Sequence, residues 1–208
     1  MKIHTVTQGS PEWFALRIGK VTGSNLKKVF GSTNLEYMDE LIAEQLTEMS
    51  DDNDYLSDAM QRGIDLQDYA LDIYEQMHDV TLIRDGFIEC DLFPLLGYSP
   101  DGRVGIEGGV EVKCPSSKKH IQYIRQGKLP NDYKWQVLSS FIINPHCKWY
   151  DFMSYDPRVS QRPVFIYRTM REDVIDDLND AVDGLRKFFD KMDKYKSDIL
   201  FPVNTALV

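Results

Sequence analysis

The stretch SPDGRVGIEGGVEVKCP, Ser99–Pro115, decides the fold because it places charged side chains around two glycine turns. Asp101 opens the first turn, and Glu111 and Lys113 follow the second turn in a short run of β-forming residues. Successive side chains of a strand point to opposite faces, so we expect the valines on one face and Glu111 and Lys113 on the other. The stretch therefore predicts a hairpin with one apolar face and one charged face.

The charged face offers hard oxygen ligands for a metal ion. The turn that starts at SPDG brings Asp101 back towards Glu111, beside the backbone carbonyl of Val112. This oxygen set is the one that Mg²⁺ or Mn²⁺ prefers over thiolates and imidazoles. Lys113 would lie beside such an ion, where an ammonium group can polarise a water or stabilise charge on a phosphate. The alternative is an exposed Glu111–Lys113 ion pair worth less than ~1 kcal/mol.

The rest of the chain predicts a sheet between helices. From Val80 onward, runs of β-forming residues alternate with glycine turns, and two more strands are expected at residues 148–156 and 163–169. Apolar residues spaced by three and four predict helices at Tyr37–Met49, Ala59–Met77, Lys118–Gln126, Asn131–Ile143 and Arg171–Lys196. We therefore expect an α/β (α+β) fold with a central mixed sheet flanked by helices.

Length and composition limit the classes of protein that fit. With 208 residues and 42% apolar side chains, the chain can fold as one domain over residues 1–208. Its three cysteines form no CxxC pair, which argues against a disulfide scaffold or a structural zinc site. No apolar run approaches the roughly 18 residues of a membrane span, and no signal peptide is visible. We expect a cytoplasmic protein with no membrane partner.

The formal net charge of −9 does not leave the basic footprint that nucleic-acid binding usually requires. The acidic residues, however, are concentrated in residues 36–58 and 172–193. Basic residues lie mostly elsewhere, at Lys20, Lys27, Lys28, Lys113, Lys118, Lys119, Arg125 and Lys128. A basic groove on an acidic body is therefore compatible with the sequence.

Four ordered blocks carry a resemblance to a known family. They are QGSPEWFALRIGKVTGS (8–24), RGIDLQDYALDIYE (62–75), GYSPDGRVGIEGGVEVKCP (97–115) and YKWQVLSSFII (133–143), followed by an aromatic strand ending in YDPR. With these blocks the chain resembles the lambda-exonuclease family of viral recombination nucleases, also called YqaJ-like, of the PD-(D/E)xK nuclease superfamily. The resemblance runs from Gln8 to about Pro157 and implies a restriction-endonuclease-like core.

The resemblance assigns roles to the hairpin residues. Asp101, Glu111 and Lys113 match the catalytic and metal positions of the family, and the carbonyl of Val112 matches its backbone metal ligand. Asp91 looks like a further acidic metal position, although Glu89 could take its place. The resemblance therefore implies a metal site built from these oxygen ligands.

Residues of the N-terminal block match positions that hold a DNA phosphate in the family. These are Arg17 and Ser24, with Ser99 beside them. The guanidinium fork of Arg17 suits two phosphate oxygens, and Ser24 near a helix start adds a hydroxyl and backbone donors. Trp13, about one turn before Arg17, can share its helix face. The alternatives are an ordinary surface position for Arg17 and a core position for Trp13.

Further helical residues complete the set of candidates. Gln136 lies where the superfamily often has a glutamine that orients the substrate or water, and Tyr133 can share its helix face. The alternative for Gln136 is a solvated helix position. Met60 is a candidate apolar wedge that separates the base pairs before cleavage.

Gln67 departs from the family pattern. The family has a glutamate at this helical position, which adds a carboxylate ligand to a metal, whereas Gln67 has an oxygen without charge. Asp68 points about 100° away around the helix and is no automatic replacement. Either a second metal binds through Gln67, Asp91 or water, or it binds poorly, or the chain has lost part of its activity.

The resemblance implies a Mg²⁺-dependent exonuclease, with Mn²⁺ as a substitute, that degrades linear double-stranded DNA from the 5′ end and leaves 3′ single strands. It also implies a ring-shaped homotrimer, a single-strand annealing protein as partner, and a bacterial cytoplasm if a phage encodes the chain. Two alternatives stay open: an endonuclease of the same superfamily, and a DNA-end-binding accessory protein with a weakened site. An iron–sulfur relative would need four cysteine ligands, and the chain has three.

Overall fold

The computed structural model describes residues 1–50 and 57–201, apart from the side chains of residues 58–60. In chain order its elements are β1 (Lys2–His4), α1 (Pro11–Arg17), β2 (Val21–Thr22), the 3₁₀ helix η1 (Gly23–Asn25), α2 (Leu26–Val29), α3 (Asn34–Thr47), α4 (Asp58–His78), β3 (Phe87–Glu89), β4 (Leu96–Tyr98), β5 (Gly102–Val104), β6 (Gly108–Lys113), α5 (Ser117–Gln126), α6 (Asn131–Ile143), β7 (Trp149–Tyr155), β8 (Val164–Met170), the 3₁₀ helix η2 (Arg171–Val174) and α7 (Ile175–Leu200).

The strands form two mixed four-stranded sheets rather than one continuous central sheet. The first sheet has the order β1-β3-β4-β2, and the second has the order β5-β6-β7-β8. The chain passes from one sheet to the other at Ser99–Asp101, between β4 and β5. Pro100 lies in this link and has no backbone N–H to donate to a neighbouring strand. The predicted α/β fold class is confirmed, but the expected single central sheet is divided into two sheets at this link.

Strand β6 lies inside the second sheet and separates two environments. It pairs antiparallel with β5 and parallel with β7. As the alternation predicts, Val110 and Val112 pack in a cluster with Ala70, Leu71 and Tyr74 of α4. Glu111 and Lys113 therefore lie on the face of the sheet that α4 does not cover, and α6 approaches that face.

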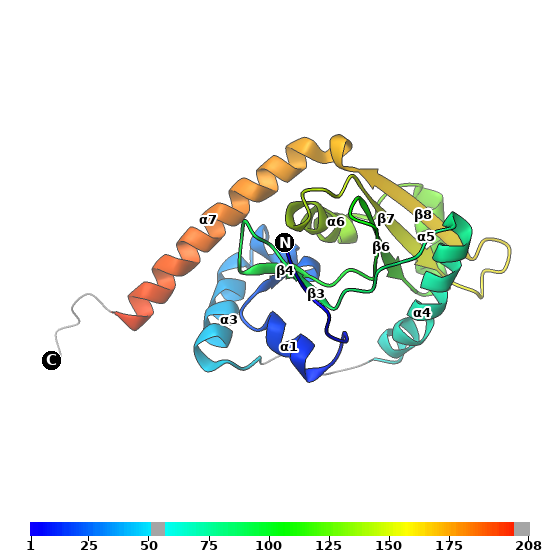
Figure 1. Cartoon of the computed structure of the whole chain (residues 1–208). Coiled ribbons are helices and arrows are strands. Elements are labelled where there is room, and N and C mark those ends of the chain that lie inside the picture. Colours follow the sequence, from blue (N-terminus) through cyan, green and yellow to red (C-terminus); the bar gives the residue numbers. More distant parts are fainter. Residues whose placement is uncertain (51–56, 202–208) are drawn as a thin grey trace.

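The helices around the sheets begin and end close to their predicted positions. Ser10 caps α1 by accepting a hydrogen bond from the Trp13 N–H at 3.3 Å. Helix α6 spans the predicted residues, and Figure 1 shows α7 as a long helix along one side of the molecule. The predicted apolar stripe of α7 is buried, with Leu178, Ala181, Leu185, Phe188 and Met192 in the largest core cluster.

Within the described residues, no helix combines the length and the apolar character that crossing a membrane requires.

Candidate active site

Two carboxylates meet at the start of the second sheet. Asp101 leaves the link after β4, and its Oδ2 accepts a hydrogen bond of 2.7 Å from the Val112 backbone N–H. Glu111, the residue before Val112, is only 2% exposed. The hairpin therefore brings both acidic side chains into one buried region, as their sequence spacing predicted.

Burial and mutual repulsion make this pair of carboxylates difficult to ionise. Burial first, and then the negative charge of Asp101, raise the pKa of Glu111 to about 7. Burial also raises the pKa of Asp101, although Lys113, the Val112 N–H and Arg84 act in the opposite direction. Like charges that are held close together in a buried site favour an added cation or an added proton.

Lys113 is the cation that the structure places beside the pair. Its ammonium group forms an ion pair with Glu111 on the same face of β6. Burial lowers the pKa of Lys113, but the charges of Glu111 and Asp101 outweigh that effect and hold the pKa above its ordinary value. Its Nζ also lies 5.7 Å from the ring centroid of Tyr133 on α6. Lys113 is therefore a protonated group held over the two acids.

Helices α4 and α6 each contribute a glutamine to the carboxylates. The Nε2 of Gln67, on α4, donates a hydrogen bond to Asp101. Gln136, on α6, forms a side-chain hydrogen bond with Glu111. The sequence alone left Gln136 open between a site residue and a solvated one, and the structure brings it to the site together with Gln67.

A second group of predicted residues lies beside the link that carries Asp101. The Trp13 indole donates hydrogen bonds to Ser99 Oγ at 2.8 Å and to the Gly86 carbonyl at 3.0 Å. The Arg17 guanidinium carbon lies 4.0 Å from the centroid of the Trp13 ring. Both residues line a cavity of about 340 Å³. The Trp13–Ser99 hydrogen bond thus connects one wall of this cavity to the segment that carries Asp101.

Ser24 is exposed in η1, and its Oγ lies 3.3 Å from Thr22 Oγ1. Thr22 and Asn25, its neighbours in sequence, line the same cavity as Arg17. The structure thus brings Ser24 to the edge of the Arg17 cavity. Met60 belongs to α4, but its side chain lies outside the described residues.

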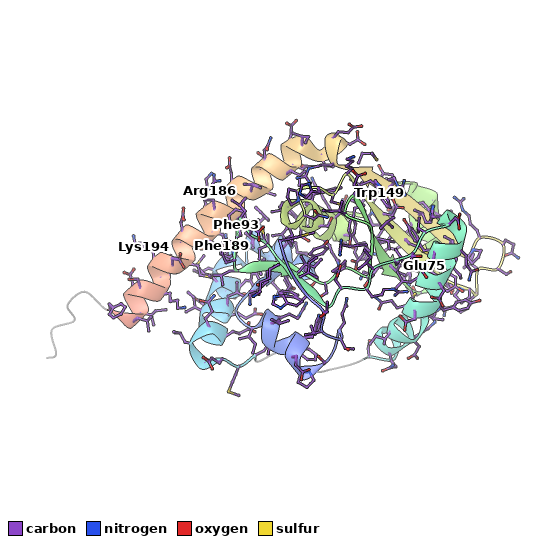
Figure 2. The ribbon with its side chains drawn as sticks, viewed as in Figure 1. Glu75, Phe93, Trp149, Arg186, Phe189 and Lys194 are labelled. Atoms are coloured by element: carbon purple, nitrogen blue, oxygen red, sulfur yellow. The ribbon has the colours of Figure 1, made fainter. Side chains whose placement is uncertain are left out.

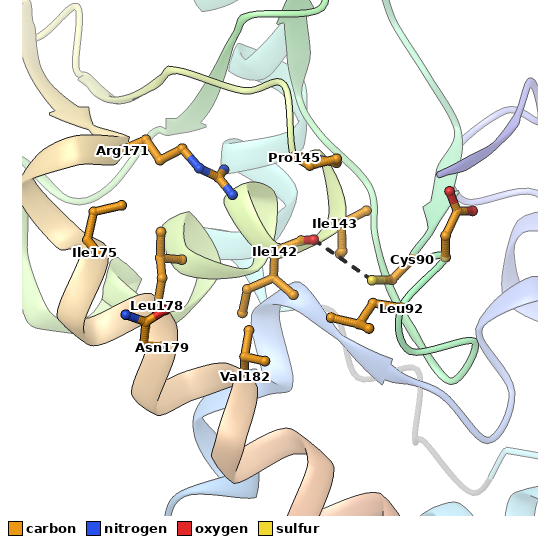
Figure 3. A pocket seen from close by; sticks show the side chains of 11 residues that line it. Cys90, Leu92, Ile142, Ile143, Pro145, Arg171, Ile175, Leu178, Asn179 and Val182 are labelled. Carbon is orange, nitrogen blue, oxygen red and sulfur yellow. Dashed lines mark hydrogen bonds between the residues drawn. The ribbon is translucent and has the colours of Figure 1, made fainter.

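The structure does not bring Asp91 to the carboxylate pair. Asp91 follows β3 at the turn of the β3–β4 hairpin, where its carboxylate pairs with the N-terminal amine of Met1. Asp101 lies beyond the other end of β4. Asp91 instead lines a different cavity of about 320 Å³ between α6 and α7, where Cys90 donates a long hydrogen bond to the Ile142 carbonyl (Figure 3).

The alternative to Asp91, Glu89, is also engaged elsewhere. Its carboxylate lies 3.3 Å from His4 Nε2 and 3.4 Å from the ammonium groups of Lys2 and Lys20. These contacts hold β1 and the residue before β2, Lys20, against β3. The prediction that Asp91 or Glu89 adds a third carboxylate to the site is therefore wrong, since both residues are engaged elsewhere.

Two residues near the site were missed from the sequence. Arg84 acts electrostatically on Asp101 and also pairs with Asp68 of α4 at 3.6 Å. The Gln8 amide donates to the carbonyls of Asp85 and Pro100 at 3.1 and 3.0 Å, which fixes the residue before Asp101. Only the resemblance could have indicated Gln8, because this residue begins its first block. No sequence pattern indicated Arg84.

The donor set fits a hard divalent cation. Asp101, Glu111, the Val112 carbonyl and the Gln67 side chain offer oxygens of the kind that Mg²⁺ and Mn²⁺ bind. Two repelling buried carboxylates with one ammonium group also leave a negative charge for such an ion to neutralise. Across residues 1–50 and 57–201, however, no three His, Cys, Asp or Glu side chains gather as a metal site. The ion would therefore depend on two carboxylates with neutral oxygens and water.

Comparisons with known proteins agree with this architecture. Residues 12–145 match the YqaJ-like viral recombinase domain. The structure is similar to that of an alkaline exonuclease from Laribacter hongkongensis, with 31% identity, a TM-score of 0.78, and coverage of 92% of this chain and 98% of that one. The same enzyme in complex with dAMP matches equally well. No curated protein matches the chain.

A phage-related exonuclease from Haemophilus somnus 129PT has a TM-score of 0.56 at 15% identity, covering 85% of this chain and 96% of that one, which shows a shared fold alone. Fold and site together define a protein of the nuclease class, with a mixed α/β architecture and a buried pair of carboxylates. The chain belongs to the family of YqaJ-like viral recombinases.

Proposed function

We propose that this chain is a divalent-metal-dependent deoxyribonuclease that degrades linear double-stranded DNA from the 5′ end and leaves 3′ single strands. The observation that carries the proposal is the convergence of Asp101 on the Val112 backbone of β6, beside the Glu111–Lys113 ion pair. A bound Mg²⁺ would supply Lewis-acid activation of a water and of the phosphate. Asp101, Glu111, the Val112 carbonyl and Gln67 are the groups that would hold it.

The chain's own residues then have distinct tasks. Lys113 stays protonated between the two acids, so it offers positive charge to the phosphate as negative charge develops during in-line displacement. Gln136 fixes the orientation of Glu111 through its hydrogen bond. Tyr133 stacks on Phe152 with ring centroids 4.7 Å apart, and the Tyr133 ring lies beside the Lys113 ammonium group.

The cavity beside Trp13 is the proposed site of the 5′ phosphate. Arg17 stacks on Trp13, and the Trp13 indole donates a hydrogen bond to Ser99, two residues before Asp101. Ser24 at the edge of the cavity adds a further donor. A 5′ phosphate bound there would place the first phosphodiester near the carboxylates, which favours cutting from an end over cutting within a duplex.

The assembly and partners are part of the same proposal. We infer a single nuclease domain that forms a ring-shaped homotrimer around DNA and hands its 3′ strand to a single-strand annealing protein. Support comes from membership of the recombinase family and from the net charge of −9, since an acidic exterior discourages DNA from binding outside a channel.

One time course tests direction and end dependence. Linear duplex labelled at the 5′ or the 3′ end, with closed circular DNA as control, should lose the 5′ label first in Mg²⁺ while the circles stay intact. Nicking of the circles would favour the endonuclease alternative.

A second experiment tests the phosphate cavity. Arg17→Ala should slow digestion of a 5′-phosphorylated duplex more than that of a 5′-hydroxyl duplex. An equal loss of rate on both substrates would remove Arg17 from this role.

A DNA-end-binding accessory protein is the second candidate. The observation that favours it is Gln67, whose amide donates a hydrogen bond to Asp101 where the family has a metal-binding carboxylate. Such a protein would bind duplex ends at every Mg²⁺ or Mn²⁺ concentration without shortening them. Digestion by the parent protein that is lost in Glu111→Gln would exclude it.

A further inference from the structure

A cavity of about 290 Å³ between α5 and the start of α6 has no role in the site described above. Its lining is polar and includes the ammonium groups of Lys119 and Lys128 and the amides of Gln122 and Gln126. Lys128 has no ion-pair partner within residues 1–50 and 57–201. The cavity therefore offers positive charge and hydrogen-bond donors to an anion.

Ring contacts connect this cavity to the catalytic lysine. Lys113 lies 5.7 Å from the Tyr133 ring, and the rings of Tyr133 and Tyr123 are 6.3 Å apart. Lys119 in turn lies 5.5 Å from the Tyr123 ring, and Tyr123 itself lines the cavity. An anion in the cavity would thus lie a few side chains from a phosphate held at Lys113.

Helix α6 sets the order of the sites. A Cβ on Gly23 would come within 2.6 Å of Ser139 Oγ, so η1 lies against α6, and Thr22 and Asn25 at its ends line the proposed 5′-phosphate cavity. Moving towards the helix N-terminus, Gln136 bonds Glu111, Tyr133 lies at Lys113, and Asn131 lines the cavity. The interval from Ser139 to Asn131 is about 12 Å at ~1.5 Å per residue. Along α6, the carboxylate pair therefore lies between η1, beside the Arg17 cavity, and the cavity at Asn131.

We propose that this cavity binds a backbone phosphate of the cut DNA strand, on the 3′ side of the bond to be cut, through Lys119 and Lys128. The inference rests on the proposed function, because the 5′ phosphate at Arg17 defines the other side. A strand held by phosphate contacts on both sides of the carboxylate pair has its scissile bond fixed in position.

Asp132 limits the affinity of the cavity. Its carboxylate lies 3.3 Å from Lys119 Nζ, and both side chains are exposed. A phosphate must compete with this carboxylate for Lys119. Removing the Asp132 charge should therefore strengthen DNA binding, whereas removing the lysines should weaken it.

The test compares two double variants with the same change of charge. Lys119→Gln/Lys128→Gln removes the cavity lysines, and Lys187→Gln/Lys194→Gln removes two exposed lysines of α7, where Figure 2 shows Lys194 far along the helix. Binding of a 5′-phosphorylated duplex is measured by fluorescence anisotropy in Ca²⁺ over a range of salt concentrations. Thermal unfolding checks that every variant is folded.

The cavity variant should bind about ten-fold more weakly than the control at ~0.1 M salt, and its slope of log affinity against log salt should be less steep by about 1 to 2. Asp132→Asn should bind about two- to five-fold more tightly, the equivalent of one exposed ion pair. A cavity variant with the affinity and slope of the control would overturn the inference.

Neutral methylphosphonate links locate the contact. Placed one at a time on the 3′ side of the first scissile bond, they should weaken binding of the parent at one or two positions and leave the cavity variant unaffected there. An equal loss in both proteins would overturn the inference while the proposed function stands. A parent that neither binds duplex nor shortens it in Mg²⁺ would overturn both.

Discussion

Asp151 and Glu111 are both buried in the second sheet, on opposite faces, and their surroundings differ. Asp151 receives two hydrogen bonds of 2.8 Å from Arg168 and one of 2.7 Å from the Tyr74 hydroxyl. Glu111 shares a single ammonium group, that of Lys113, with a second carboxylate, Asp101. The Asp151 carboxylate is thus matched by a full set of donors, whereas at Glu111 one ammonium group is shared by two repelling carboxylates.

This difference separates a carboxylate with a full set of donors from one of a repelling pair. A buried acid that is matched by a full set of donors stabilises the packing of α4 on the sheet. A buried pair of acids that repel each other destabilises the protein unless a ligand neutralises it. The excess of negative charge at Asp101 and Glu111 therefore supports the proposal that they hold a metal ion.

The largest expected effect comes from neutralising Glu111. Glu111→Gln should lower the rate of digestion of linear duplex in Mg²⁺ by at least about 10³-fold, because it removes a metal ligand and the partner of Lys113. Its free energy of unfolding in EDTA should stay the same or rise, because repulsion with Asp101 is relieved. Digestion at the parent rate would exclude Glu111 from catalysis.

Neutralising Asp151 on the other face should instead lower stability and leave digestion nearly unchanged. Asp151→Asn should lower the free energy of unfolding by about 2–3 kcal/mol, below the roughly 3–5 kcal/mol of a fully buried pair because Arg168 is partly exposed. Digestion by the folded variant should change little. Urea denaturation provides the measurement, and stability equal to that of the parent would show that the α4 face does not depend on this network.

The pH dependence of stability should reveal the strained pair. In EDTA, Glu111 keeps its proton up to a pKa of about 7 in the folded protein but releases it near 4.5 in the unfolded chain. Between these values the folded state binds more protons, so this group makes stability fall as the pH rises. Denaturation midpoints of the parent and of Glu111→Gln should therefore diverge across this range. Parallel curves would contradict the raised pKa.

The smallest effect concerns Gln67. Gln67→Glu should lower the Mg²⁺ concentration for half-maximal digestion by about three- to ten-fold, since the number of charged ligands tunes affinity. Gln61→Glu adds the same charge to an exposed position of α4 and serves as the control. The same shift in both variants would mean that charge near α4, and no added ligand, is responsible.

Sequence periodicity predicted the parts of the fold that depend on local pattern. The alternation along β6 correctly separated the valines from Glu111 and Lys113, and the apolar spacing before Pro145 gave both ends of α6. These features follow from the two-residue and 3.6-residue repeats of strands and helices. The division into two sheets was not visible, because it depends on which strands pair across the link at Pro100.

The site was predictable where its residues are close in sequence. Asp101 and Glu111 are joined by one hairpin, and their proximity followed from the turn. Asp91 was expected at the site but lies in the turn of the β3–β4 hairpin, and Asp101 follows the other end of β4. The position of Asp91 depends on the pairing of β3 with β4, which carries it away from Asp101. The contacts of Gln67 and Gln136 require α4 and α6 to pack on the sheet, and no local pattern determines that packing.

Calorimetric titration of Mn²⁺ into the parent, Asp101→Asn and Asp91→Asn tests the central claim most directly. The buried pair on the α6 face should make the parent and Asp91→Asn bind the ion with the same affinity, and binding to Asp101→Asn should be lost. Equal binding by all three proteins, or loss of binding in Asp91→Asn alone, would contradict a metal site at Asp101 and Glu111.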